Sequence, residues 1–581
     1  MKALFHATAL IAVLAAGAVM AQPAAKPAPA AAAPIPPMPA HTEVFMPMRD
    51  GVKLAANVYT PAGAGPWPVV LQRTPYLKDP DLKRLNAQYA HYIIDQVNRY
   101  TSHGYVLVVQ DVRGKGHSEG FYSAFNDDIP DGYDTVEWVA KQSWANGKVG
   151  ITGASALGIT SNMAAIAAPP HLVAAYVIVA PNDRFQNSYM GGVLKEKDTV
   201  DWLKGQGVSD QVIDDLRSRV IGNIDAVRTD MSQGMQFIRI PMYNVGGWYD
   251  IFNSGNTYNF NWLQNNGSMG ARGNQKLFMG PFGHGPLSGD LVYPGADNMM
   301  ANADQELRWW DYWLKGVDNG IMVEPPVRYL MMAAARKGAY STKNRFIEAA
   351  NWPPESREVR YYITADHGLT TRAPTVGDAK VSYRFDPANP VATIGGANLT
   401  FDRGPMDQRG IPERQDYLRF ETPVLTRDVA ITGHVGAEIW AATDGPDTDF
   451  VAKLIDVYPD GYEALVLDAP IRARYRHGRL PDQVAMMTPG APEKLVVDLW
   501  NTALTFEAGH RIELVITSSN APRFEVNPNT GEAPGSHTMA PRVAVNTIYM
   551  DRDHPTALVL PVVYPNDPVP AATPPAKPKR K

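Results

Sequence analysis

The chain has 581 residues, of which 45% are apolar and 19% charged, and its formal net charge is −5. This length suits two or three domains, and the slightly acidic balance argues against nucleic acid or an anionic membrane surface as a partner. The sequence contains no cysteine, which excludes a cysteine nucleophile, thiolate metal ligands and disulfides.

The N-terminus predicts export. Residues 1–21 carry one positive charge at Lys2, a short apolar run and small residues before Gln22, the pattern of a signal peptide cleaved after Ala21. An uncleaved anchor helix is disfavoured because the apolar run is short for a bilayer core of ~30 Å. We therefore expect a secreted or periplasmic protein with no membrane span after signal cleavage.

Two segments outside the predicted domains are low in complexity. Residues 22–40 are rich in proline and alanine and are interpreted as a linker, and residues 565–581 form a basic tail that is interpreted as disordered.

Residues 41–326 predict a mixed α/β domain. The strand pair at TEVFMPM and GVKLAANVYTP is joined by Arg49-Asp50-Gly51, a hairpin signal. Short apolar runs then alternate with helical stretches, which indicates a parallel sheet covered by helices on both faces. These predicted strands are 68–73, 105–111, 149–153, 173–181, 240–247 and 276–280.

The rest of the chain predicts a small cap and a second domain. Residues 184–236 have a mostly helical pattern and lie between two predicted strands, so the segment should sit over the carboxyl end of the sheet, where open α/β sheets bind ligands. Residues 327–564 show alternating strands separated by turns, such as 431–443 and 510–517, which indicates an all-β sandwich or jelly roll.

The segment ITGASALGIT places Ser155 between a predicted strand and a predicted helix. A serine at such a turn exposes its Oγ at the edge of the sheet as a nucleophile. Small residues at Gly153 and Gly158 would let strand and helix approach closely, and the backbone N–H of Ala156 could stabilise an oxyanion. A serine in an ordinary tight turn is the alternative.

A serine nucleophile needs a histidine base and an acid that orients it. His284 follows the last predicted sheet strand, whereas most other histidines after Ser155 fall in the β region. Asp250 follows the preceding strand. Its rivals are less well placed, since Asp183 follows an earlier strand and Asp304 comes after His284. The order Ser, Asp, His, each after a strand, is that of an α/β hydrolase. Considered alone, Asp250 could instead be a helix N-cap, and His284 could be an ordinary turn residue.

Several motifs in chain order resemble the serine hydrolases that include cocaine esterase (the CocE/NonD family), the α-amino-acid ester hydrolases and the Xaa-Pro dipeptidyl peptidases. They are RTPY at 73–76, DVRGKGHSEG at 111–120, GASALG at 153–158, GGWYD at 246–250, GPFGH at 280–284, WWDYWLKG at 309–316, FDPANPV at 385–391 and VAKLIDVYPDG at 451–461. The resemblance implies an α/β-hydrolase domain with a helical cap, followed by a C-terminal jelly-roll β-sandwich.

The resemblance also implies site residues. It gives Ser155, Asp250 and His284 as a catalytic triad, and Tyr76 as an oxyanion donor beside the Ala156 N–H. The family usually has tyrosine after the nucleophile, where this chain has Ala156, so the local pocket should be wider. The acidic residue with which α-amino-acid ester hydrolases hold the substrate ammonium, close behind the nucleophile, is replaced by Leu157 and Gly158. The predicted cap also looks short for a dipeptidyl peptidase.

We predict from these residues a serine hydrolase that cleaves an ester or amide acyl bond of a small molecule through an acyl-enzyme, without a metal or organic cofactor. Trp248, Phe252 and Phe282 are candidates for the acyl pocket, with ordinary core packing as the alternative. The rival functions are an Xaa-Pro-type dipeptidyl peptidase, a β-lactam acylase, and a ligand-binding protein with an inert hydrolase domain. The oligomeric state stays open, a homo-oligomer included.

Overall fold

The computed structural model describes residues 35–80, 87–181, 183, 188–218, 231–295, 303–336, 339–536 and 538–563. The predicted signal peptide, most of the predicted linker, the basic tail and part of the predicted cap lie outside the described residues. Within the described part of the chain, no helix has both the length and the apolar character needed to cross a membrane.

A ten-stranded sheet forms the centre of the first half of the chain, in the order β1-β2-β4-β3-β5-β6-β9-β10-β11-β14. β1 and β2 form the predicted hairpin, and every neighbouring pair from β4 to β11 is parallel. The strands are β1 Thr42–Pro47, β2 Lys53–Tyr59, β3 Trp67–Thr74, β4 Val106–Asp111, β5 Ala145–Ala154, β6 Leu172–Ile178, β9 Met242–Tyr249, β10 Lys276–Gly283, β11 Val327–Met331 and β14 Arg345–Ala349. The predicted parallel sheet is thus confirmed.

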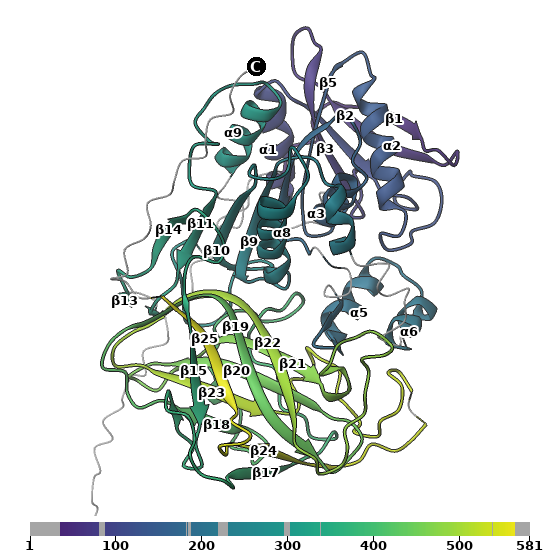
Figure 1. The fold of residues 1–581 in the computed structure, drawn as a ribbon. Helices are drawn as coiled ribbons and strands as arrows, with labels where there is room; N and C mark the ends of the chain where they lie inside the picture. Colours follow the sequence, from purple (N-terminus) through teal and green to yellow (C-terminus); the bar gives the residue numbers. More distant parts are fainter. Residues whose placement is uncertain are drawn as a thin grey trace, which may run out of the picture.

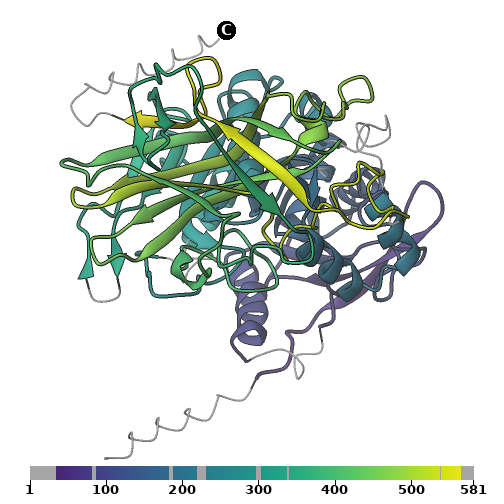
Figure 2. The same cartoon turned by 90° about the horizontal axis from the view of Figure 1, so that it is seen from below.

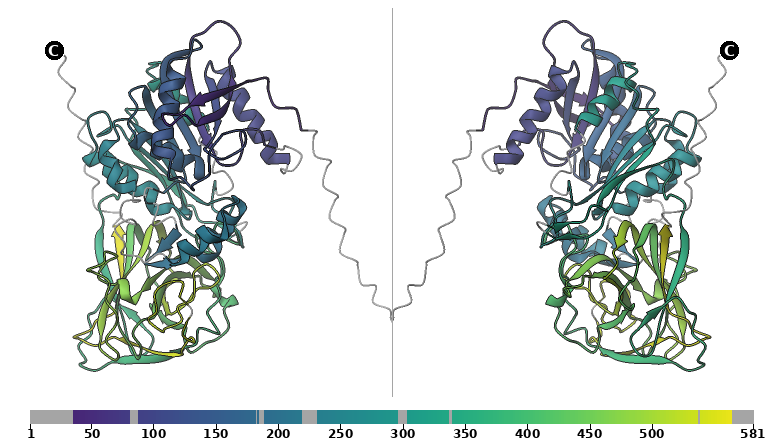
Figure 3. Two further views of the ribbon diagram at one scale, coloured as in Figure 1. Left: turned by 90° about the vertical axis from the view of Figure 1, so that its right-hand side faces the viewer. Right: turned by 90° about the vertical axis from the view of Figure 1, so that its left-hand side faces the viewer.

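Helices cover both faces of this sheet (Figure 3). The hydrophobic cluster on one face contains residues of α2, α3 and α8, and the cluster on the other face contains residues of α1 and α9. Their bounds are α1 Ala87–Ser102, α2 Asp128–Ala140, α3 Ala156–Ile166, α8 Asn253–Asn266 and α9 Ala303–Trp313. This two-sided cover explains why the central strands have near-continuous apolar sequences.

The sheet extends further along the chain than the predicted boundary between residues 326 and 327. β11 pairs in parallel with β10, and β14 pairs antiparallel with β11, so both strands complete the first sheet. That boundary was placed too early, because the sequence of a short strand does not say which of two sheets it joins. The first sheet ends at Ala349.

The described part of the predicted cap lies between the two halves of the molecule, where Figure 1 shows α5 and α6 below α3. It contains β7 Tyr189–Met190, β8 Val193–Leu194, α5 Glu196–Gly205, α6 Asp210–Ser218 and the 3-10 helix η1 Met231–Phe237. Apolar residues of α5 and α6, among them Leu203, Ile213 and Leu216, form a hydrophobic cluster that also includes Tyr475 of the β region.

The second half of the chain is all β, as predicted, and Figure 2 views it from its own side. One sheet has the order β16-β15-β25-β19-β24-β17 with β22 also paired to β19, and the other has the order β18-β23-β20-β21. The strands are β15 Arg357–Ile363, β16 Leu369–Thr370, β17 Lys380–Phe385, β18 Leu418–Glu421, β19 Val429–Thr443, β20 Asp449–Val457, β21 Glu463–Arg472, β22 Glu493–Phe506, β23 Arg511–Thr517, β24 Ala544–Tyr549 and β25 Ala557–Val563. Smaller elements are the ribbon of β12 Ala335–Arg336 and β13 Ala339–Tyr340 and the 3-10 helices η2 Gln408–Gly410 and η3 Ala473–Tyr475.

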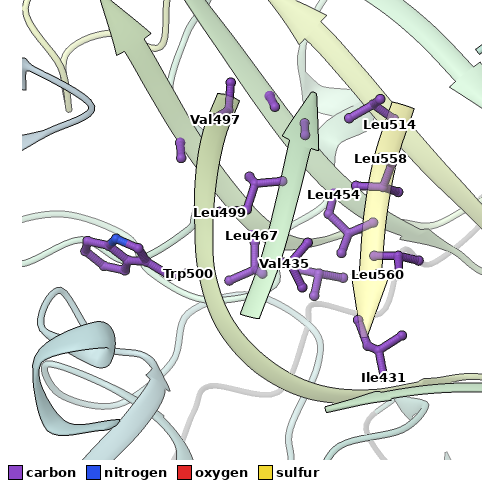
Figure 4. Packing of buried hydrophobic residues seen from close by; sticks show 14 of the residues in the cluster. Ile431, Val435, Leu454, Leu467, Val497, Leu499, Trp500, Leu514, Leu558 and Leu560 are labelled. Atoms are coloured by element: carbon purple, nitrogen blue, oxygen red, sulfur yellow. The ribbon is translucent and has the colours of Figure 1, made fainter. Parts of the chain in front are cut away.

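The largest hydrophobic cluster belongs to both halves. In the β region, leucine, isoleucine and valine side chains from both sheets pack against each other (Figure 4). Trp248 and Leu277, from β9 and β10 of the first sheet, belong to the same cluster as Leu454 and Leu558 of the β region. The two halves of the chain therefore share one apolar core.

Candidate active site

Ser155 occupies a strained turn between β5 and α3. Its backbone has φ +57° and ψ −121°, a sparsely populated region that costs a non-glycine residue about 1–3 kcal/mol and that clusters at functional sites. A Cβ on Gly153 would lie 2.3 Å from the Leu157 Cβ, and one on Gly158 would lie 2.7 Å from the Ala180 Cβ. Glycine is therefore required at both positions for strand and helix to approach closely enough to form this turn.

The structure brings Ser155, His284 and Asp250 into one hydrogen-bonded row. His284 directly follows β10 and Asp250 directly follows β9, two neighbouring parallel strands whose carboxyl ends lie at the same edge of the sheet. The Nε2 atom of His284 lies 2.7 Å from the Oγ of Ser155, and its Nδ1 lies 2.7 Å from Oδ2 of Asp250. The His284 side chain is 8% exposed and that of Asp250 is fully buried.

The hydrogen bonds fix the roles of the two ring nitrogens. An ionised carboxylate can only accept, so Nδ1 of His284 carries the hydrogen that it donates to Asp250. In the neutral ring Nε2 is then an acceptor, placed to receive the hydrogen of the Ser155 hydroxyl. The second carboxylate oxygen of Asp250 accepts the backbone N–H of Phe252 at 2.7 Å, which holds the carboxylate in this orientation.

The rival acids lie elsewhere. The carboxylate of Asp304 is fully exposed and lies 3.7 Å from Arg99. Asp183 is buried and lies 3.4 Å from Arg479 of the β region. Asp250 is not the N-cap of α8, since that position belongs to Phe252. Of the three candidate acids, the structure brings Asp250 to the histidine.

The two candidate oxyanion donors lie just after two neighbouring strands, β5 and β3. Ala156 is the first residue of α3, where backbone N–H groups have no partner within the helix. Tyr76 follows β3 by two residues, and β3 is paired in parallel with β5. Tyr76 and Ala156 thus lie at the same edge of the sheet as Ser155. The Ala156 side chain is 2% exposed and belongs to a core cluster.

The motif DVRGKGHSEG fixes the chain just after Tyr76. The buried carboxylate of Asp111 accepts the backbone N–H of Lys78 at 2.6 Å and that of His117 at 3.2 Å. Leu77, between Tyr76 and the anchored Lys78, has a φ of +77°. The motif therefore contributes to the conformation of the segment that carries Tyr76.

The three aromatic candidates for the acyl pocket differ in position. Phe252 packs edge-on against the His284 ring, with the ring centroids 5.4 Å apart. Trp248 is 1% exposed, donates its Nε1–H to the carbonyl of Leu330 at 2.8 Å and packs in the shared core. Phe282 is also 1% exposed and lies in the core cluster on the side of α1 and α9. The ring of Phe252 therefore contacts the Ser155–His284–Asp250 row, whereas the rings of Trp248 and Phe282 pack in core clusters.

Sequence reasoning missed a buried lysine beside this row. Lys195 precedes α5, is 1% exposed, and lies with its Nζ 3.3 Å from the carbonyl oxygen of Ile251. The ammonium also faces the rings of Phe252 and Trp500, at 6.0 Å and 5.2 Å from their centroids. Its only sequence signal is a lysine in the apolar stretch YMGGVLK. Trp500 lies apart from the labelled leucines of the core in Figure 4.

Burial, together with repulsion from Arg523, lowers the pKa of Lys195 to about 7, although Asp198, Asp250 and Asp183 oppose the shift. The unfolded chain keeps an ordinary lysine pKa and so binds the proton up to a higher pH. This group therefore lowers stability most below about pH 7, and the free energy of unfolding rises as pH increases above that value.

Lys195→Met should consequently stabilise the protein more at about pH 7 than at about pH 9, with a difference of ~2 kcal/mol in the free energy of unfolding. Urea unfolding at both pH values measures this. Lys204→Met, at an exposed position of α5, the helix that Lys195 precedes, is the control and should show no such difference. An equal effect of Lys195→Met at the two pH values would contradict the assignment.

Among the described residues, one group of side chains has the spacing of metal ligands: Glu43, Asp79 and His117, all exposed. The ammonium of Lys78 lies 2.8 Å from Glu43 and also contacts the Asp79 carboxylate. A cation therefore already bridges these two carboxylates. None of the three residues belongs to the Ser155–His284–Asp250 row.

Comparison with known proteins identifies the class of hydrolase. Residues 50–226 match the family model of the X-Pro dipeptidyl-peptidase (S15 family), and residues 319–559 match that of the X-Pro dipeptidyl-peptidase C-terminal non-catalytic domain. Cocaine esterase from Rhodococcus sp. (strain MB1 Bresler) is 29% identical, over 90% of this chain and 98% of the relative. The chain belongs to the S15/CocE family of serine hydrolases. The predicted family and the predicted enzyme class are confirmed.

Two solved structures agree with this fold over nine-tenths of the chain. An aminopeptidase from the marine sediment archaeon Thaumarchaeota archaeon superposes with a TM-score of 0.74 at 25% identity, over 90% of this chain and 96% of the other. An α-amino acid ester hydrolase superposes with a TM-score of 0.73 at 25% identity, with the same coverage. The S15/CocE architecture of an α/β domain followed by an all-β domain is thus the architecture of this chain.

Proposed function

We propose that the protein is an exported esterase that forms an acyl-enzyme on Ser155. The observation that carries the proposal is the unbroken row from the Ser155 hydroxyl through His284 to the buried Asp250, with 2.7 Å at both steps. A serine hydroxyl is a weak nucleophile until a base removes its proton, and this row supplies the base and its orienting acid. Export is inferred from the signal-peptide pattern of residues 1–21.

Each residue has a defined part in the two-step reaction. His284 Nε2 takes the Ser155 proton as Oγ attacks the substrate carbonyl, and Asp250 stabilises the imidazolium that forms. Tyr76 and the N–H of Ala156 donate to the oxyanion of the tetrahedral intermediate. His284 then protonates the leaving group, and the acyl-enzyme is left on Ser155. Water, activated by His284, attacks that acyl group and restores the free serine.

The buried carboxylates of the cap region favour an acyl ester without a free amino group. A substrate ammonium needs an available carboxylate, yet Asp183 already lies against Arg479, and Asp198 accepts three hydrogen bonds from Leu399 and Thr400. Lys195, beside the Asp250 segment, would also repel such a group below about pH 7, where it carries its proton. The match to the X-Pro dipeptidyl-peptidase model keeps the peptidase as a second candidate.

A substrate panel separates these candidates. We expect p-nitrophenyl esters with uncharged acyl groups to be hydrolysed, and Gly-Pro-p-nitroanilide to be cleaved much more slowly or not at all. Comparison of its cleavage rate with that of N-acetylated Gly-Pro-p-nitroanilide measures how much the free amine contributes to cleavage. Cleavage of the free-amine anilide in preference to all esters would establish the dipeptidyl peptidase instead.

Covalent labelling tests the nucleophile in the same protein. A fluorophosphonate should modify the enzyme once, and peptide mapping by mass spectrometry should place the phosphonyl group on Ser155. Excess ester substrate should slow the labelling. A label on any other residue, or no label on an enzyme that hydrolyses the ester, would reject the proposed acyl-enzyme.

Tyr76→Phe should lower kcat for the ester by about 100- to 1000-fold, because removal of one oxyanion donor typically has an effect of this size. KM should change little, since the hydrogen bond strengthens only as charge develops on the carbonyl oxygen. Steady-state kinetics on the wild type and the variant measures both constants. An unchanged kcat would show that Tyr76 takes no part in the oxyanion hole.

A further inference from the structure

The proposed oxyanion donor is held by a side chain of the cap. The indole Nε1–H of Trp202, in the middle of α5, donates to the phenolic oxygen of Tyr76 at 3.0 Å. We propose that Trp202 is a positioning residue for catalysis, and that the cap thereby completes the oxyanion hole. This inference rests on the oxyanion role proposed above for Tyr76.

The direction of this hydrogen bond matters for the chemistry. A phenolic oxygen has one hydrogen and can also accept hydrogen bonds. An indole N–H can only donate, so Trp202 occupies an acceptor position of Tyr76 and does not itself use the phenolic hydrogen. A hydroxyl that accepts one hydrogen bond is also polarised into a better donor of the next. The geometry thus prepares Tyr76 to donate to a developing oxyanion.

The hydrogen bond from Trp202 restrains a tyrosine whose ring is only partly packed. The residue is 38% exposed, and it lies in a short connection after β3, where the described backbone contact is from its own N–H to the Thr74 Oγ1 at 2.9 Å. A partly exposed tyrosine can change rotamer readily. The bond from Trp202 therefore adds a restraint on the position of the hydroxyl.

Trp202 itself packs against both the cap and the hydrolase domain. Its ring stacks on Phe125, with centroids 5.8 Å apart and an angle of 11° between the planes. It packs against the apolar cluster of the cap and also against the cluster of α2, α3 and α8. Trp202 thus joins the cap to the domain that carries the nucleophile.

The helix that carries Trp202 is fixed at both ends. Near its start, Asp198 accepts the backbone N–H groups of Leu399 and Thr400 at 3.0 Å and 2.9 Å, and the Thr400 hydroxyl at 2.9 Å. At its end, the Gln206 carbonyl accepts the ammonium of Lys115 at 2.5 Å. Hydrogen bonds from both the β region and the hydrolase domain therefore fix the position of the indole relative to Tyr76.

A double-mutant cycle tests the proposal on the full chain. Trp202→Phe keeps an aromatic ring against Phe125 and removes the N–H. We expect it to lower kcat for a p-nitrophenyl ester about threefold to tenfold, with KM and Tm nearly unchanged. In the Tyr76→Phe background the same change should lower kcat less than about twofold, because the group that Trp202 positions is gone.

Incorporation of 3-benzothienylalanine at position 202, which replaces the indole N–H by sulfur and keeps the size of the ring, should lower kcat as much as Trp202→Phe does.

Trp262→Phe is the matched control, since this tryptophan of α8 packs against the same cluster as Trp202 and should leave kcat unchanged. Equal losses from Trp202→Phe in the wild-type and Tyr76→Phe backgrounds, or no loss from the benzothienyl variant, would overturn the positioning role while the triad stands. If Tyr76→Phe alone leaves kcat unchanged, the oxyanion role fails and the inference fails with it.

Discussion

Ser155→Ala is expected to lower kcat for a p-nitrophenyl ester by about six orders of magnitude, the effect seen when the nucleophile of a Ser-His-Asp unit is removed. Alanine has no atom that can attack the substrate, so only the uncatalysed attack of water remains, helped by binding and the oxyanion donors. Active-site titration gives the concentration of competent wild-type enzyme. Steady-state kinetics of both proteins, with contaminating wild-type enzyme excluded, then gives the ratio of their kcat values. Labelling by a fluorophosphonate should disappear in the variant.

Ser161→Ala provides a matched control for this change. Ser161 lies six residues further along α3, is fully buried and donates its hydroxyl to the Leu157 carbonyl at 2.7 Å. Its removal should cost about 1 kcal/mol of stability through the lost hydrogen bond and leave both kcat and labelling near the wild-type values. A Ser155→Ala protein that still turns over the ester at more than about a hundredth of the wild-type rate would reject Ser155 as the nucleophile.

Asp250→Asn should lower kcat by about 10⁴-fold with little change in the fold. An asparagine can turn its amide N–H toward Nδ1 of His284, which favours the ring tautomer with the hydrogen on Nε2. That nitrogen could then no longer accept the proton of Ser155, although the three side chains would keep their places. The loss should appear in the rate of fluorophosphonate labelling as well as in kcat.

The β region contains a natural control for the aspartate. His510 and Asp456 form a second buried pair, with Nδ1 of the histidine 2.8 Å from the carboxylate, at 6% and 3% exposure of the side chains. Neither residue belongs to the Ser155–His284–Asp250 row. Asp456→Asn should therefore reduce stability without a large change in kcat. Equal losses of activity from Asp250→Asn and Asp456→Asn would indicate a general effect of disrupting a buried pair.

The sequence was sufficient to predict the row of Ser155, Asp250 and His284. Each residue follows a strand of a parallel sheet, and the carboxyl ends of such strands meet at one edge, so sequence order and strand position alone bring the three together. The glycine spacing was informative for a similar reason, because α3 approaches Ala180, just after β6, so closely that there is no room for a Cβ at Gly158.

Features that depend on how separate parts dock were not predictable. Trp202 lies 126 residues from Tyr76 in the chain, and nothing in its local sequence distinguishes it from the other tryptophans. Trp248 and Phe252 are aromatic residues four positions apart, yet one lies in the shared core and the other beside His284. Their environments diverge because Trp248 is within β9, whereas Phe252 follows it. Strand β11 was assigned to the wrong half because its pairing with β10 is a tertiary contact.

The shared apolar core has a consequence for how such a protein can be altered. Trp248 and Leu277 of the first sheet belong to one cluster with Leu454 and Leu558 of the β region. A gene cut after the codon for Ala349 would leave both products with wide apolar surfaces facing water, the kind of surface that drives aggregation. The β region is therefore not an exchangeable module. Replacement by that of a relative would require compensating substitutions on β9 and β10, close to the residues that carry Asp250 and His284.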